Sequence, residues 1–439
     1  MLVLIHEFGH FIAARIFGMR VEKFYLFFNP WFSVLKVKRK DTEYGVGWVP
    51  FGGYVKIAGM VDESMDREQM RQPPKPDEFR SKPAWQRLLV IGGGVLMNLV
   101  LAVAIYIGIS AVWGEKYIAN RDVAYGYAFS PLGVEIGFRN GDRILAVNGK
   151  QVERVKDVFF EIVLNDRAEV SVLRGEDTLT VAIGPEHKAA FLSAQEPLLV
   201  PRVPFVVEKV MPSGGADNGG MLAGDVPVAV IVAGDSASVR EAIPMQFYDE
   251  FTAAFARHRG RTVELAVQRD SAGVALTRTL TVPVDTMAMI GVQIASLEKL
   301  LSITHVEYSF FAAFPAGVRR TGVEIANYWR QFKLIFNPST KAYKSLGGPI
   351  AIASIFPSYW SFEEFWRLTA FLSIVLAVMN ILPIPALDGG QMLFIFVEIV
   401  TRRKPSDRSM EIAQWIGMII LFGLIAFALK NDIFRFFIN

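Results

Sequence analysis

The chain has 439 residues, of which 52% are hydrophobic and 12% aromatic, and its mean hydropathy is +0.32. This length suffices for two to four domains, and the composition indicates membrane-spanning segments rather than a soluble core alone. The net charge of +3 is too small to indicate nucleic-acid binding. The absence of cysteine excludes a disulfide framework, a thiolate metal site and a cysteine nucleophile.

The sequence begins with an apolar stretch that contains the motif His6-Glu7-Phe8-Gly9-His10. On a helix, the two histidines lie on one face, so both imidazoles can bind one metal ion. Glu7 lies beside them as a candidate general base. An ordinary core helix needs neither two histidines nor a glutamate, so the motif predicts zinc-assisted hydrolysis with one Zn²⁺ per chain.

Four apolar segments are expected to span the membrane, and the first is oddly short. From Met1 to Phe17 it falls below the ~20 residues that cross a bilayer, so we expect the numbering to begin inside a longer natural helix. The four segments fall within the ranges 1–35, 88–113, 361–400 and 411–431. The loops 36–87 and 401–410 are rich in Lys and Arg, which predicts that both are cytoplasmic and that the segment 114–360 lies on the opposite face.

The loop 36–87 contains a glycine-punctuated, β-favouring stretch at 44–57, which predicts a β-hairpin. This stretch is too apolar for a solvated loop, so we expect it to re-enter the membrane where protein or a cavity satisfies its backbone. If it lies beside the metal site, its free edge can pair with an unwound substrate strand. The candidate substrate-contacting residues in it are Gly52, Gly53 and Tyr54.

The segment on the outer face divides into two similar α+β pieces, 114–202 and 203–300. Both carry a small-residue turn followed by a Gly-Asp pair and a strand, at Asp142 in the first piece and Asp225 in the second, which predicts an internal duplication. Both pieces resemble PDZ domains of the bacterial protease-associated kind, although the second lacks the Asn of the Asn-Gly turn. They either contact peptide substrates or only brace and gate the membrane part. The following segment, 301–360, reads as an amphipathic helix on the outer interface, or as one packed on the two domains.

Two histidines leave the zinc site one protein ligand short, and the other histidines fall on the outer face. Two carboxylates are candidates: Glu22, just past the first helix, and Asp388, the only acid between Arg367 and Glu398. An unpaired charge there costs ~2.5–3.5 kcal/mol on insertion scales, which a metal would offset, so Asp388 is favoured. Prolines and glycines beside it predict a broken helix.

The first-helix HExxH motif, the Asn380-to-Gly390 segment (NxxPxPxLDGG) and the PDZ-like domains between the second and third spans together resemble the site-2 protease family of intramembrane zinc metalloproteases, of the bacterial RseP type. The resemblance covers essentially the whole chain. It implies three zinc ligands, a general base and a substrate-contacting segment: His6, His10 and Asp388; Glu7; and Asn380, Pro383 and Pro385. One departure is the second span, where Gly92-Gly93-Gly94 and Asn98 stand without the proline often found in a GPxxN motif.

The resemblance also implies the setting of the enzyme. We expect a multi-pass protein of the bacterial inner membrane, a monomer in contact with the lipid bilayer, with its active site toward the cytoplasm and the PDZ-like domains in the periplasm. The implied substrates are single-pass membrane proteins already trimmed by another protease, such as anti-sigma factors of the envelope-stress response, and remnant signal peptides. Two other functional classes fit the sequence less well. A catalytically silent scaffold that binds peptides is disfavoured by Glu7, and a transporter by the lack of an inverted repeat.

Overall fold

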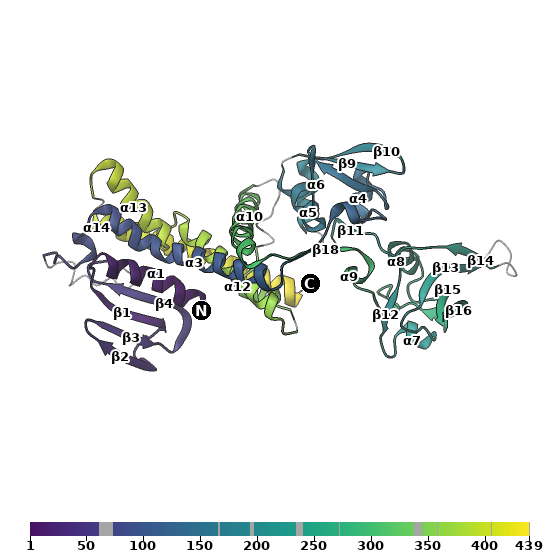
Figure 1. The fold of residues 1–439 in the computed structure, drawn as a ribbon, viewed down its shortest axis with the longest axis horizontal. Coiled ribbons are helices and arrows are strands. Elements are labelled where there is room, and N and C mark those ends of the chain that lie inside the picture. The colour runs from purple at the N-terminus through teal and green to yellow at the C-terminus, as the bar shows by residue number, and fades with distance from the viewer. Residues whose placement is uncertain are drawn as a thin grey trace. The chain divides into compact units, whose positions relative to one another are not determined.

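The computed structural model describes residues 1–60, 73–165, 167–193, 197–233, 240–271, 273–337, 343, 346–357, 359–404 and 406–438. The chain forms two compact units (Figure 1). The helical unit comprises Met1–Gly114, Glu307–Phe336 and Tyr343–Asn439, and the β-rich unit is formed chiefly by Glu115–Val306.

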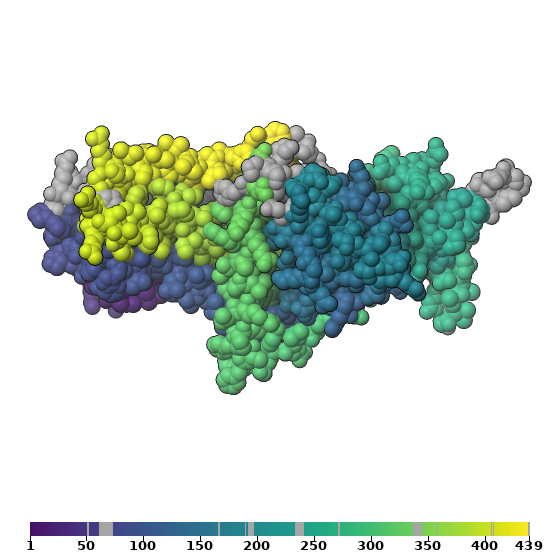
Figure 2. Space-filling model, turned by 90° about the horizontal axis from the view of Figure 1, so that it is seen from above, coloured from purple at the N-terminus to yellow at the C-terminus, as the bar shows by residue number. Residues whose placement is uncertain are grey.

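The helical unit is built around one long helix, α3, which packs against α1, α10, α12 and α13. Its helices are α1 (Leu2–Ile16), α3 (Ala84–Val112), α10 (Phe310–Phe336), α11 (Pro349–Ser354), α12 (Phe362–Ile381), α13 (Asp388–Thr401) and α14 (Asp407–Ile433), with the short turns η1 (Phe79–Ser81) and η4 (Phe434–Ile438). Of the most apolar stretch of α3, 44% is buried, against 6% for the C-terminal helix. Figure 2 shows α14, in yellow, along an outer face of this unit.

Among the described residues, three helices are long and apolar enough to cross a membrane: Ala84–Val112, Phe362–Ile381 and Arg408–Phe437. With 15 residues, α1 is not one of them. The predicted count of four spans therefore stays a prediction. The predicted break in the third span is confirmed, because α12 ends at Ile381 and α13 begins at Asp388.

Glycines set how closely the helices of this unit approach one another. A Cβ added to Gly9 on α1 would lie 2.1 Å from the carbonyl oxygen of Gly93 on α3, and one added to Gly93 would lie 2.6 Å from that of Gly9. The two backbones are therefore in direct contact, as small residues allow in membrane helix pairs. In the broken span, a Cβ on Gly389 would lie 2.2 Å from the carbonyl oxygen of Leu382, so this glycine lets the connection fold back onto α13.

A four-stranded sheet packs on α1, on the side away from α3 (Figure 1). Its strands are β1 (Val21–Phe28), β2 (Leu35–Arg39), β3 (Thr42–Val46) and β4 (Val49–Ile57), in the order β2-β3-β1-β4. β3 runs parallel to β1, and β4 runs antiparallel to it and forms an edge of the sheet.

The predicted hairpin at 44–57 is thus wrong in its pairing, because β1 lies between its two strands. The connection crosses the end of β1 at Gly47, whose N–H donates to the carbonyl of Leu26 at 2.9 Å. A Cβ on Gly47 would lie 2.1 Å from the carbonyl oxygen of Phe28, so only glycine fits this crossing. β1, which takes the place of a direct pairing between β3 and β4, lies within the range 1–35, where no strand was predicted.

Helix α10 occupies much of the segment predicted to be amphipathic. It packs on α3 at Gly317, where a Cβ would lie 2.6 Å from the backbone nitrogen of Ile107. It leaves Phe310, Phe311 and Phe314 exposed. This helix belongs to the helical unit, and its place at the membrane interface stays a prediction.

In the β-rich unit, two four-stranded sheets share one strand order. The first is β10-β9-β7-β8 and the second, from the other edge, β16-β15-β13-β14. The first piece contains β5 (Glu115–Ile118), η2 (Asn120–Asp122), β6 (Tyr127–Phe129), α4 (Pro131–Ile136), β7 (Arg143–Val147), β8 (Lys150–Gln151), α5 (Val155–Leu164), β9 (Ala168–Arg174), β10 (Asp177–Ile183), α6 (Pro185–Ser193) and β11 (Leu199–Pro201). The second contains β12 (Val207–Val210), α7 (Gly215–Asn218), β13 (Val226–Ala233), β14 (Arg240–Pro244), α8 (Tyr248–Arg257), β15 (Thr262–Ser271), β16 (Val274–Pro283), β17 (Val292–Ile294), α9 (Leu297–Leu300) and β18 (Ile303–Val306).

The same buried ion pair occurs in both pieces. Asp142, 1% exposed, accepts hydrogen bonds of 2.8 and 2.7 Å from Arg174. Asp225, fully buried, accepts two of 2.7 Å from Arg269. The aspartates of the two Gly-Asp pairs thus have one structural role, which fits the predicted duplication. Peptide binding by either piece stays a prediction.

Candidate metal centre

Two buried side chains and one half-buried side chain, from two helices, meet at one point of the helical unit. His6 and His10 lie one turn apart on α1, and Asp388 is the first residue of α13. Their ligand atoms form a triangle: the two imidazole Nε2 atoms are 3.3 Å apart, and Asp388 Oδ2 lies 3.1 Å from that of His6 and 3.5 Å from that of His10. The fold therefore brings Asp388 together with His6 and His10, although these residues lie near opposite ends of the sequence.

The spacing of this triangle fits a zinc ion. Ligand atoms ~2.0–2.1 Å from a tetrahedral zinc lie ~3.3–3.4 Å from one another, which is the size of the triangle found. Asp388 Oδ2 is buried, and no hydrogen-bond donor satisfies it among the described residues. Two imidazole nitrogens and one carboxylate oxygen are also the donor set of catalytic zinc sites, so the residues present fit the metal.

The second ring nitrogen of each histidine is held by α3. His10 Nδ1 lies 2.9 Å from the carbonyl oxygen of Val90, which can accept its proton. His6 Nδ1 lies 3.1 Å from the side-chain amide of Asn98, whose oxygen is buried without a hydrogen-bond partner within the described ranges. With the amide turned over, its oxygen would accept the Nδ1 proton. Both Nε2 lone pairs are then directed at the metal position, the usual arrangement of metal-bound histidines.

Gly94 on α3 is a functional residue that the sequence analysis missed. A Cβ there would lie 2.4 Å from His10 Nε2 and 2.6 Å from His6 Cε1, so the imidazoles occupy the space that any side chain would need. The signal in the sequence was the run of three glycines in an apolar span, which was interpreted only as a departure from a motif.

A cavity of about 820 Å³ opens at the metal centre. It is lined by six predicted site residues besides His6 and His10: Glu7, Gly52, Gly53, Tyr54, Asn380 and Asp388. Gln391 and Gln414 also line it and were not predicted. The side-chain amide of Asn380 lies 3.3 Å from His6 Nε2. β4 passes close to the base, since a Cβ on Gly53 would lie 3.3 Å from Glu7 Cγ.

Two predicted residues lie outside this cavity. Pro383 is exposed, and Pro385 lines a neighbouring cavity and packs against Gly417 of α14, where a Cβ would lie 2.7 Å from its carbonyl. The alternative third ligand, Glu22, lies on β1 and forms ion pairs with Arg20 at 3.0 Å and Lys56 at 3.7 Å. Of the two candidate carboxylates, it is therefore Asp388 that joins the histidines.

Comparison with known proteins agrees with this geometry. Residues 1–424 match Peptidase family M50. A protein of Xylella fastidiosa named "Putative zinc metalloprotease" is 28% identical over 98% of this chain and 96% of its own length. The "Regulator of sigma E protease" of Haemophilus influenzae is 26% identical over 99% of this chain and 96% of its own. The chain therefore belongs to peptidase family M50, the site-2 proteases, and is an intramembrane zinc metalloprotease.

Proposed function

We propose that this enzyme hydrolyses a peptide bond within the transmembrane segment of single-pass proteins. In this proposal it crosses the bacterial inner membrane four times, as a monomer, with its metal centre toward the cytoplasm and the β-rich unit in the periplasm. The observation that carries the proposal is the zinc-sized triangle of His6, His10 and Asp388, which opens into one cavity with Glu7 among apolar helices.

The residues that line the cavity have different roles in the proposed reaction. A zinc ion, when bound, supplies Lewis acidity toward a carbonyl oxygen and a water molecule. Glu7 takes the proton of the attacking water and delivers it to the nitrogen of the leaving amide. Val90 and Asn98 fix the orientation of the two imidazoles from α3. Asn380 can donate to and accept from the peptide backbone beside the cleaved bond.

The substrate must be unwound before it can be cleaved, because the carbonyls of a helix are hydrogen-bonded and shielded by side chains. β4 is an edge strand and lines the cavity, so its free N–H and C=O groups can pair with an extended substrate segment. Gly52 and Gly53 have no side chains to hold the substrate backbone away from the edge.

The proposed physiological substrates are anti-sigma factors of the envelope-stress response and remnant signal peptides. The name of the Haemophilus influenzae relative, "Regulator of sigma E protease", supports the first class. The two pieces of the β-rich unit would admit only substrates whose outer domain has already been trimmed. A reporter with its full outer domain should therefore be cleaved more slowly than the trimmed form, and equal rates would remove this part of the proposal.

Substitution of the base tests the mechanism. Glu7→Gln should retain zinc, because Glu7 is not among the clustered ligands, and should abolish cleavage of a transmembrane reporter. Glu22→Gln is the matched control, because Glu22 lies on β1 in ion pairs away from the cluster, and it should keep both zinc and activity. Cleavage that survives Glu7→Gln at the wild-type rate contradicts the assigned role.

A further inference from the structure

A second cavity, of about 300 Å³, adjoins the metal cavity. The two share four lining residues, so the second continues the first: Met60, Ala386, Gln391 and Gln414. Its walls come from the chain that follows β4, the first turns of α3, and helices α13 and α14. A substrate bound at the metal can therefore extend into this space.

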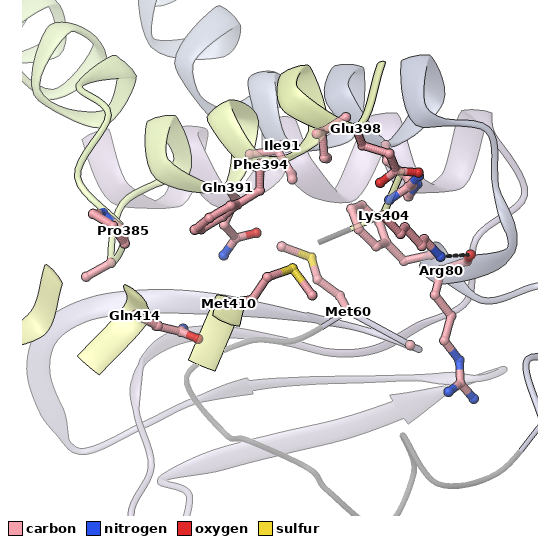
Figure 3. Close-up of a pocket in the computed structure, with 15 residues that line it drawn as sticks. Met60, Arg80, Ile91, Pro385, Gln391, Phe394, Glu398, Lys404, Met410 and Gln414 are labelled. Carbon is pink, nitrogen blue, oxygen red and sulfur yellow. Dashed lines mark hydrogen bonds and ion pairs between the residues drawn. The ribbon is translucent and has the colours of Figure 1, made fainter. Parts of the chain in front are cut away.

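The cavity has an apolar middle and a charged end (Figure 3). The amides of Gln391 and Gln414 lie at the side that is shared with the metal cavity. Met60 and Met410 lie in the middle, and Lys404 lies at the far side. Methionine side chains adapt to apolar groups of different shapes. The lining thus suits an elongated ligand with apolar side chains and a polar group at one end.

The charged end is cationic. Arg87 is neutralised by Glu398, with 2.5 Å between Nη2 and Oε1, and the Nε of Arg80 donates to Glu78 at 2.7 Å. The Lys404 ammonium donates to the backbone carbonyl of Arg80 at 3.2 Å, and within the described part of the chain no carboxylate lies at ion-pair distance from it. Counting only the described residues, one positive charge is therefore left over at this end, where it favours an anion.

The direction of β4 shows which part of a substrate reaches this cavity. Gly53 lies beside Glu7, and the chain runs from there through Ile57 to Met60 at the second cavity. A strand that adds antiparallel to β4 has its N-terminal side at the C-terminal end of β4. Four residues separate Gly53 from Ile57 and seven separate it from Met60, so the second cavity lies about four to seven residues before the cleaved bond.

We propose that this cavity is a specificity subsite for the segment on the N-terminal side of the cleaved bond. It takes apolar side chains, and Lys404 binds an acidic side chain about four to seven residues before that bond. This inference rests on the proposed function, since it deepens the recognition of the same transmembrane substrate.

The test uses the full-length enzyme and single-pass reporters that differ at one residue. The reporters carry Ser, Asp or Lys at each position from four to eight residues before the cleaved bond. Each is cleaved by the wild type, by Lys404→Glu and by the control Arg403→Glu, which reverses a charge in the same exposed loop outside the cavity lining. The readout is the ratio of kcat/KM for the Asp reporter to that for the Lys reporter.

The wild type should prefer Asp over Lys by about fivefold at one of these positions, as expected for a partly exposed ion pair. Lys404→Glu should invert this preference, and Arg403→Glu should keep it. The proposal is overturned if Lys404→Glu leaves the preference unchanged, if both variants alter it equally, or if it follows the anionic lipid content of the bilayer instead of the reporter. Failure of the enzymes to cleave even the Ser reporters would instead refute the proposed function.

Discussion

Gly94→Ala should empty the metal site although Gly94 donates no ligand. The added Cβ would lie 2.4 Å from His10 Nε2, where ordinary contacts begin at 3.4 Å. The ring must therefore move by about 1 Å, and it cannot simply swing aside, because its Nδ1 is held by the carbonyl of Val90. Metal sites tolerate displacements of ~0.2 Å. We expect the zinc affinity to fall by at least ~100-fold, the upper part of the range for disturbed supporting contacts.

The matched control is two residues away on the same helix. A Cβ on Gly92 would meet only Met392 Cε, at 3.7 Å, so Gly92→Ala should keep zinc and activity. The assay is zinc content of the purified enzyme by elemental analysis, followed by zinc competition against a chelator and cleavage of a transmembrane reporter. Wild-type zinc affinity in Gly94→Ala would refute the reasoning, because it would mean that the imidazoles lie elsewhere.

Two further substitutions test supporting contacts. Asn98→Ala should weaken zinc binding by ~10-fold, because the Nδ1 atom of His6 loses its contact with Asn98. Ser110→Ala, on the same helix, should leave the zinc affinity unchanged. Chelator competition measures both affinities, and equal zinc affinity in the two variants would contradict a role for the contact between Asn98 and His6. Arg174→Met should destabilise the first piece of the β-rich unit by about 3 kcal/mol, since it leaves Asp142 buried without its partner and Arg174 itself is only a quarter exposed. Faster amide hydrogen exchange of β7, β9 and β10 in the full chain measures this loss. Arg269→Met should instead speed the exchange of β13, β15 and β16. Unchanged exchange rates in either variant would contradict the prediction.

The chemistry of this site could be predicted from sequence because it depends on rare residues in an unfavourable setting. Two histidines and a glutamate at helical spacing have few other uses on an apolar helix. Asp388 could be identified although it is far from the histidines in sequence, because an isolated carboxylate in a membrane-spanning segment needs a partner that offsets the cost of burying its charge. The broken helix beside it followed from its prolines, which cannot continue the backbone hydrogen bonds.

What could not be predicted depends on contacts between distant backbones. β1 falls within the range 1–35, where no strand was predicted, so the stretch 44–57 appeared to pair with itself. The space that Gly94 leaves for two imidazoles is a property of the packing of α1 on α3. The two prolines were assigned together to the substrate segment; Pro383 is exposed, Pro385 packs on α14 and lines the second cavity, and substrate contact by either stays a prediction. Their position depends on how the connection folds back, which sequence spacing does not specify.

The metal centre joins the beginning of the chain to a residue near its end, which has a consequence for biosynthesis. A chain that is still emerging from the ribosome carries the histidines and the glutamate long before Asp388 has been made. During that interval the ligand set lacks its carboxylate, so the nascent protein cannot yet attack neighbouring helices. Because Asp388 begins α13, proteolytic competence is acquired only after this residue has been made, and the linear order of the ligands acts as a built-in delay.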